Sequence, residues 1–283
     1  MLAKQGGTAL LLVAPQVPEL VVALFVVLFG LAFGSFLNVC ITRLPQHASL
    51  VHPGSHCPRC GAAIRPQDNV PLLSWMLLGG RCRSCRERIP WRYPAVELAT
   101  AALFLLSYLR DGLGVAGAGL AVFCFLLLGL AVMDAERMRL PDAFTLPGLL
   151  LGLVHAAQLP AHSLQQRLAA AGEALLWAVL AALALLFIRW VYFLLRNEEG
   201  IGMGDVKLLA MIAAWLGPAP TVLTLLLGTT AAALYGVAMV GLSGEEGGFR
   251  TTRLPMGSFL CAAGLYVVFA GEPILAWYMK FFP

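Results

Sequence analysis

Long apolar runs with almost no charge are the feature that most constrains how this chain folds. Only 12% of the 283 residues are charged, about half the share in an ordinary soluble domain, which excludes a disordered chain, a secreted disulfide-rich miniprotein and a nucleic-acid-binding domain. The runs are continuous rather than alternating, so a membrane β-barrel is not expected. Because about 20 apolar residues span a bilayer, the sequence predicts an all-α, polytopic membrane protein with about eight transmembrane helices. Their expected positions are 19–42, 94–109, 115–133, 143–158, 170–195, 206–217, 219–242 and 255–278.

Basic residues set the orientation of these helices. The first run is too long for the core of a signal peptide, so we expect it to be retained as a span after an N-terminal tail. Eight alternating helices place fourteen of the nineteen Lys and Arg residues on one side and four on the other. Since basic residues accumulate on the cytoplasmic side, that side is predicted to be cytoplasmic and both termini to face outward. The fourteen are Arg43, Arg59, Arg65, Arg81, Arg83, Arg86, Arg88, Arg92, Arg137, Arg139, Arg196, Lys207, Arg250 and Arg253.

The connection at 43–92 is the one stretch long enough to form a domain outside the membrane. The chain therefore divides into the tail with the first helix (1–42), this cytoplasmic domain (43–92) and the remaining transmembrane helices (93–283). Eight arginines and two acids give the domain a net charge of +6, which suits the cytoplasmic side and contact with anionic membrane lipid. It lacks an array of aromatic residues for stacking bases, so we expect no nucleic acid partner.

Four of the seven cysteines form two Cys-x-x-Cys pairs within this domain. Each pair offers two thiolates to one ion, and the two pairs complete a tetrahedral, structural zinc site. A domain of this size builds little core, so a metal would hold it together. Disulfides or a thioredoxin-like redox pair are the alternatives, but a cytoplasmic location disfavours stable disulfides and no βαβ pattern accompanies the motif. The expected ligands are Cys57, Cys60, Cys82 and Cys85.

Acidic residues at the cytoplasmic ends of the predicted helices are the candidates for chemistry, because ionisable groups at membrane depth are costly. Asp134 ends the third helix, where an acid opposes the helix dipole. Asp205 closes the Gly-Met-Gly-Asp sequence at 202–205, whose glycines permit an extended backbone that a peptide substrate can approach. Structural alternatives stay open, since Asp134 can be solvated and Asp205 can cap a helix. Capping is the favoured interpretation of Asp142, and Glu136 is expected to be solvated.

Two carboxylates that converge on one water molecule carry out aspartic protease chemistry. Like charges held close cannot both ionise, so such a pair shares one proton. The charged member takes a proton from water while the neutral member hydrogen-bonds the scissile carbonyl. Asp134 and Asp205 are predicted on the same side of the membrane, which such a pair needs but which does not by itself bring them together.

These motifs, in this order, resemble the type IV prepilin peptidases (prepilin leader peptidase/N-methyltransferases) of bacterial pilus and type II secretion systems. The resemblance covers nearly the whole chain from about residue 18. A Gly-x-Gly-Asp motif alone is a weak signal, whereas the ordered set is specific. The matching segments are 34–39 and 43–45, the two Cys-x-x-Cys pairs, 68–75 between them, Gly80, 93–97, Asp134 with 140–142, and 202–207.

The resemblance implies an enzyme of the bacterial cytoplasmic (inner) membrane with its catalytic sites on the cytoplasmic side. Its substrates would be prepilins or pseudopilins, whose short basic leader is cut after a glycine, and Asp134 and Asp205 match the catalytic pair of the family. Many members then methylate the new N-terminal residue, with S-adenosylmethionine as donor. No dinucleotide-type fold or cofactor loop is visible in the sequence, so methylation rests on the resemblance alone.

Gly34, Asn38, Arg43 and Glu97 are the candidates for a role in methylation, because they flank the cytoplasmic domain in the matching segments. A neutral amine must be held in line with the donor methyl, and Glu97 is an acid that can orient it. Glu97 can equally be a first-turn helix acid, and the domain can serve only to dock the substrate. One departure from the family pattern stands at 254–259, where Met and Ser replace the usual Phe and Pro, and we expect it to leave the catalytic pair untouched.

Two other classes of function fit part of the pattern. An intramembrane protease of the presenilin-like class also uses a Gly-x-Gly-Asp motif but needs no cysteine-rich loop. A zinc-bearing assembly or transport protein without enzymatic activity would need no paired carboxylates, and apart from Arg189 the predicted helices carry no polar relay suited to transport.

Overall fold

The computed structural model describes residues 17–158, 163–198, 200–243 and 254–280. Across these ranges the chain forms helices and no β-strand, as the apolar runs predict. The N-terminal tail and two of the counted cations, Arg250 and Arg253, lie outside the described residues. The helices are α1 (Val17–Arg43), α2 (Leu73–Leu77), α3 (Arg92–Asp111), α4 (Val115–Arg137), α5 (Asp142–Gln158), α6 (Leu164–Arg196), α7 (Met203–Leu216), α8 (Pro218–Ser243), α9 (Met256–Ala270) and α10 (Glu272–Met279), with short 3-10 helices η1 (Leu44–Gln46) and η2 (Pro66–Asp68).

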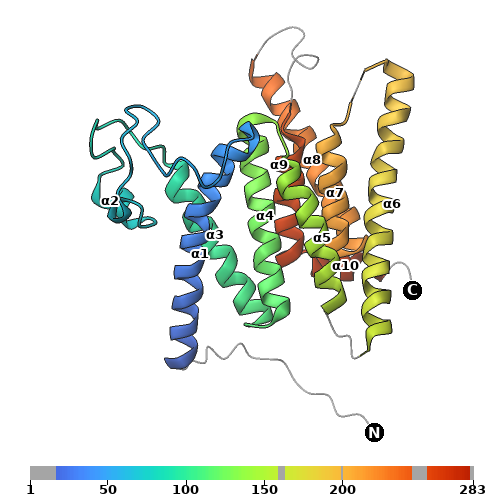
Figure 1. Cartoon of the computed structure of the whole chain (residues 1–283). Helices are drawn as coiled ribbons and strands as arrows, with labels where there is room; N and C mark the ends of the chain where they lie inside the picture. Colours follow the sequence, from blue (N-terminus) through green and yellow to red (C-terminus); the bar gives the residue numbers. More distant parts are fainter. Residues whose placement is uncertain (1–16, 159–162, 199, 244–253, 281–283) are drawn as a thin grey trace.

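Four helices, α1, α4, α6 and α8, are long and apolar enough to cross a membrane. The bent pair α9 and α10 is a fifth candidate if it is counted as one span. Because α3, α5 and α7 are shorter or less apolar, eight spans stay a prediction. Figure 1 shows the connections after α1, α4 and α6 at one end of the bundle, which is the end where the sequence gathers its basic residues.

The last predicted span, 255–278, is wrong as a single helix. α9 and α10 are separate, and the chain bends by 76° between them. Pro273 explains the bend, because in a continuous helix its ring would meet the carbonyl of Phe269 and it has no N–H to donate. The predicted break at Gly217-Pro218 is confirmed: it separates α7 from α8, and Gly217 has φ 73°, a conformation that favours glycine.

α4 lies at the centre of the bundle and packs against α3, α5 and α9. Its residues Phe123, Leu127 and Leu130 join Leu37 of α1 and Met211 of α7 in one apolar core, where each side chain is at most 1% exposed. On the outer faces of α1 and α6, by contrast, large apolar side chains are exposed, as expected for helices that contact lipid. The core fixes the relative positions of α4, α7 and α9, whose ends form the site described next.

Candidate active site

Asp134 occupies the last turn of α4 and is only 5% exposed. Its Oδ2 accepts a hydrogen bond from the backbone N–H of Ser258 at 2.7 Å and another from the Ser258 hydroxyl at 3.2 Å. A buried carboxylate without such donors would be strongly destabilising. The solvated alternative for Asp134 is therefore wrong, and the start of α9 holds this side chain in place.

Asp205 is half-buried in the first turn of α7. The extended backbone expected over 202–205 is confined to Gly202, with φ −72° and ψ 146°, because the helix already begins at Met203. Gly202, and not Asp205, is the N-cap residue. Asp205 therefore projects from a regular helix rather than from an unwound segment, at a helix end where an acid is favourable.

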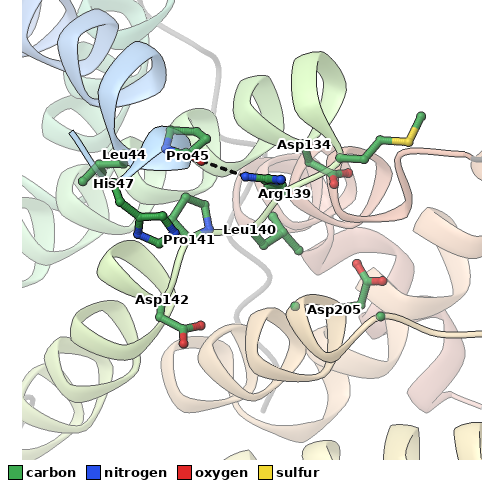
Figure 2. Close-up of a pocket in the computed structure, with 12 residues that line it drawn as sticks. Leu44, Pro45, His47, Asp134, Arg139, Leu140, Pro141, Asp142 and Asp205 are labelled. Atoms are coloured by element: carbon green, nitrogen blue, oxygen red, sulfur yellow. Dashed lines mark hydrogen bonds between the residues drawn. The ribbon is translucent and has the colours of Figure 1, made fainter.

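Both carboxylates line one cavity of about 420 Å³. In Figure 2, Asp134 from α4 and Asp205 from α7 point toward one another. They are close enough for the charge of one carboxylate to disfavour the charge of the other. The structure thus brings together the two acids that the sequence singles out. The other lining residues are Leu44, Pro45, His47, Met138, Arg139, Leu140, Pro141, Asp142, Gly202 and Gly204.

Two glycines allow Leu140 to pack between the helices that carry the site. A Cβ on Gly204 of α7 would lie 3.0 Å from the Leu140 Cβ, and one on Gly257 of α9 would lie 2.8 Å from the Leu140 Cδ1. The same Cβ on Gly257 would lie 3.0 Å from Asp134 Oδ2. A side chain at either position would force Leu140 or Asp134 to shift, so these glycines let the α4–α5 connection close against α7 and α9.

Asp142 is not a member of the pair. Asp142 is predicted to cap α5 but is instead the first residue of that helix, because the Pro141 carbonyl accepts the first N–H groups of the helix. Its exposed carboxylate accepts a hydrogen bond from Lys207 Nζ at 2.6 Å, across the cavity from Asp134 (Figure 2). Glu136, expected to be solvated, forms an ion pair with Arg92 at 2.8 Å.

The start of the 43–92 segment forms one wall of the cavity. Arg139 Nη1 donates to the Pro45 carbonyl at 3.1 Å and so holds η1 there (Figure 2). His47 follows η1 with φ 55° and also lines the cavity. The 43–92 segment and the paired carboxylates therefore share a boundary.

Three of the methylation candidates meet where α1 packs against α3. The Asn38 side-chain amide donates to the Tyr93 carbonyl at 3.0 Å, and a Cβ on Gly34 would lie 2.6 Å from the Glu97 Cα. The fourth candidate, Arg43, lies apart from them and shapes the loop that follows α1. Its guanidinium donates to the carbonyls of Ser49, Pro53 and Gly54.

Leu72 connects the 43–92 segment to Glu97, a contact that the match over 68–75 does not by itself reveal. Glu97 is 8% exposed, and its Oε2 accepts the Leu72 N–H at 2.8 Å. Leu72 has φ 57° and ψ −51°, and the Leu73 N–H lies 2.6 Å from the Pro71 carbonyl. This is a strained γ-turn, and such conformations persist only where the surroundings impose them. Glu97 therefore gives the 68–75 segment a fixed point on the helices.

Gly34→Ala is expected to destabilise the protein by about 1–3 kcal/mol, because the added Cβ would be forced into the backbone of Glu97. Gly172→Ala in α6 is the matched control, since a Cβ there meets nothing within 4 Å. The control should change stability by less than about 1 kcal/mol, in the stabilising direction. Thermal unfolding in detergent measures both, and equal Tm values for the two variants would contradict the close contact.

Ser258 is the site residue that sequence reasoning missed. The expectation that the departure at 254–259 leaves the pair untouched is wrong, because Ser258 contacts Asp134 through both its N–H and its hydroxyl. A signal was present in the departure itself, since serine brings two donors to a position where proline would bring none. Its importance could not be seen, because the contact joins residues 124 positions apart.

The four predicted metal ligands, Cys57, Cys60, Cys82 and Cys85, converge, with their sulfur atoms all within 4.8 Å of one another. Cys57 Sγ and Cys85 Sγ are 3.8 Å apart. A tetrahedral zinc with bonds of about 2.3 Å requires sulfur–sulfur edges of about 3.8 Å. No disulfide links these four cysteines. The cluster therefore fits a single metal ion.

The two Cys-x-x-Cys pairs are built alike. Cys57 donates its N–H to Ala62 and accepts from Gly61, and Cys82 donates to Glu87 and accepts from Arg86 in the same way. Gly61 and Arg86 both have positive φ, 71° and 60°. Backbone N–H groups of Cys85 and Ser84 lower the pKa of the Cys82 thiol to about 7, which favours the thiolate that a metal binds. Only three residues of 43–92 are buried, namely Pro45, Cys57 and Gly80.

Comparison with known proteins finds similar sequences over most of the chain. The family model described as the bacterial peptidase A24 N-terminal domain matches residues 28–110, and that of the type IV leader peptidase family matches residues 121–237. A Pseudomonas aeruginosa protein named prepilin leader peptidase/N-methyltransferase is 37% identical, over 90% of this chain and 92% of that protein. A Klebsiella pneumoniae protein of the same name is 42% identical, over 74% of this chain and 91% of that protein. No solved structure matches the chain.

Proposed function

The chain belongs to the type IV leader peptidase family, and from this premise we propose that it removes the basic leader from type IV prepilins or pseudopilins and then methylates the new N-terminal residue. The observation that carries the peptidase activity is the pair Asp134 and Asp205, which face one cavity from α4 and α7. A non-enzymatic zinc protein would not need paired carboxylates. A presenilin-like protease would not need the cysteine cluster.

Cleavage needs one charged and one protonated carboxylate on either side of a water molecule. The charged carboxylate takes a proton from the water, and the resulting hydroxide attacks the carbonyl carbon before the scissile bond. The protonated carboxylate donates to the carbonyl oxygen as negative charge develops on it. Asp134 and Asp205 supply these roles in a cavity large enough for an extended stretch of peptide.

The cavity belongs at the cytoplasmic face of the bacterial inner membrane. It lies at the end of the bundle where the arginine-rich connections meet, and basic residues mark the cytoplasmic side. α7 has only 14 residues, or about 21 Å of helix, so Asp205 sits at the end of a helix shorter than the bilayer core. A substrate leader on the cytoplasmic side would reach the cavity without crossing the membrane.

S-adenosylmethionine is the donor that a methyltransferase of this kind implies, and when bound it supplies the methyl group. The candidate residues do not form a cavity for it. Gly34 is closed off by the backbone of Glu97, and Arg43 is engaged with loop carbonyls. We therefore give Asn38 and Glu97 the role of fixing the 68–75 segment against α1 and α3, and we derive no transfer step through them.

Zinc is the metal that we assign to the cluster Cys57, Cys60, Cys82 and Cys85. Four sulfur ligands suit zinc, and the spacing of the sulfurs supports a tetrahedral site. Four thiolates leave no open position for water. The ion would accordingly be structural, and it would take the place of the core that the 43–92 segment lacks.

The proposed function is tested by incubating the purified full-length protein in detergent with a type IV prepilin, with and without S-adenosylmethionine. Intact mass spectrometry should show loss of the leader in both reactions. Only the reaction with donor should then gain the mass of one methyl group on the mature pilin. Unchanged prepilin would reject the peptidase activity, and a mature but never methylated product would reject the transferase activity alone.

A further inference from the structure

The start of α9 presents one hydroxyl to two acceptors beside the paired carboxylates. Ser258 Oγ lies 3.2 Å from Asp134 Oδ2 and 2.8 Å from the Ala131 carbonyl oxygen. A serine hydroxyl has a single hydrogen and rotates to suit its surroundings, so it serves one of these acceptors fully at a time. The Ser258 N–H, 2.7 Å from the same Oδ2, stays in place in either case.

We infer that Ser258 is a positioning residue that keeps Asp134 ionised before cleavage, so that Asp134 is the base and Asp205 carries the shared proton. This inference rests on the proposed peptidase function and deepens it. Hydrogen bonds to an ionised acceptor are about twice as strong as those to a neutral one. Both donors of Ser258 therefore favour the charged form of Asp134. Among the described residues, Asp205 accepts from the backbone N–H of Gly202, whereas Asp134 accepts from both the N–H and the hydroxyl of Ser258.

The Ala131 carbonyl gives the Ser258 hydroxyl a hydrogen-bond acceptor once Asp134 has been protonated. During cleavage, an O–H bond of the water breaks and its proton passes to the Asp134 carboxylate, while the water oxygen bonds to the scissile carbonyl carbon. The carbonyl oxygen takes the proton of Asp205, which completes the tetrahedral intermediate. Neutral Asp134 accepts more weakly, so the Ser258 hydroxyl turns to Ala131. When the C–N bond then breaks, its nitrogen takes the proton from Asp134 and Asp205 regains a proton from the hydroxyl of the intermediate. Ser258 gains and loses no proton, and its hydroxyl is hydrogen-bonded in both states.

Other titratable or charged groups lie near the two aspartates. Replacing Ser258 alters none of them, so the assignment of base and acid can still be tested. A limb of the pH–rate profile that one of these other groups produced would therefore stay in place in every Ser258 variant. The groups are His47 after η1, Arg139 in the α4–α5 connection, Asp142 of α5 with Lys207 of α7, Cys261 of α9, and the ion pair of Arg92 in α3 with Glu136 in α4.

The experiment measures kcat/KM for a full-length type IV prepilin against pH in detergent. Ser258→Ala is expected to move the acidic limb up by about one pH unit, because it removes a donor to the charged form. Ser258→Thr keeps both donors and should return the limb to its wild-type position. Ser258→Pro, which the first turn of a helix tolerates, also removes the N–H and should move the limb further.

Thr229→Ala in α8 is the matched control, because its hydroxyl likewise donates to a helix carbonyl, that of Leu225 at 2.7 Å, but contacts no carboxylate. Its acidic limb should match the wild type. The inference is overturned if the limb of Ser258→Ala coincides with that of the wild type, or if Ser258→Ala and Ser258→Thr lose activity equally at every pH. A wild-type enzyme that leaves the prepilin uncut would instead reject the proposed function.

Discussion

Asp134→Asn and Asp205→Asn are each expected to abolish leader removal, with a loss of about 10³-fold or more in the rate of cleavage. An amide has nearly the shape of a carboxylate but cannot take a proton from water or give one to the carbonyl oxygen. The N–H of Ser258 still has an oxygen to bind in Asp134→Asn, since the amide retains one. The fold should therefore persist, and the loss should lie in the chemical step.

Asp142→Asn is the matched control for both variants, because Asp142 lines the same cavity but pairs with Lys207. Exposed ion pairs contribute little to stability, so we expect a cleavage rate within about tenfold of the wild type. Cleavage of a prepilin followed by intact mass, together with the Tm of each variant, separates chemistry from folding. An inactive Asp142→Asn beside a normally active Asp134→Asn would mean that the first carboxylate is assigned wrongly.

The positions of the helices can be predicted from the sequence wherever each helix coincides with one long apolar run. The predicted spans 19–42, 94–109 and 143–158 lie within two residues of α1, α3 and α5 at each end. The last span fails because the apolar runs on either side of residues 271–273 are joined into one predicted helix, although the proline there interrupts it. The Gly-Met-Gly-Asp segment is expected to be extended but is helical from Met203. Gly204 packs on Leu140 there, which favours a regular helix over the other conformations that glycine allows.

The two aspartates illustrate what composition and spacing can predict about a site. Both stand out because acids are costly beside apolar helices, and the prediction that they share one side of the membrane is consistent with their common cavity. The donors to buried carboxylates cannot be predicted in this way. Ser258 donates its backbone N–H to Asp134, and Leu72 donates its own to Glu97. Every residue but proline has such a group, so only the fold reveals which of them face a buried carboxylate.

Metal content and methylation are expected to fall together in Cys82→Ser, while leader removal persists. The domain that holds Cys82 buries almost nothing else, and losing one of four zinc ligands removes most of the free energy that folds such a domain. Zinc should drop from about one ion per chain to near zero, and methylation by at least about tenfold. Cleavage should stay within about threefold of the wild type, because distant sites act independently.

The reason for this separation lies in how the cavity wall is anchored. η1 is tied to Arg139 through the Pro45 carbonyl, and the aspartates are held by α4, α7 and α9, so neither depends on the cysteines. Ser84→Ala is the matched control, because Ser84 is exposed, lies between Cys82 and Cys85, and keeps its N–H. Elemental analysis and intact mass measure the three quantities. A metal-free preparation that cleaves and methylates normally would reject the zinc site, and equal loss of both activities in Cys82→Ser would show that the cavity wall depends on the metal after all.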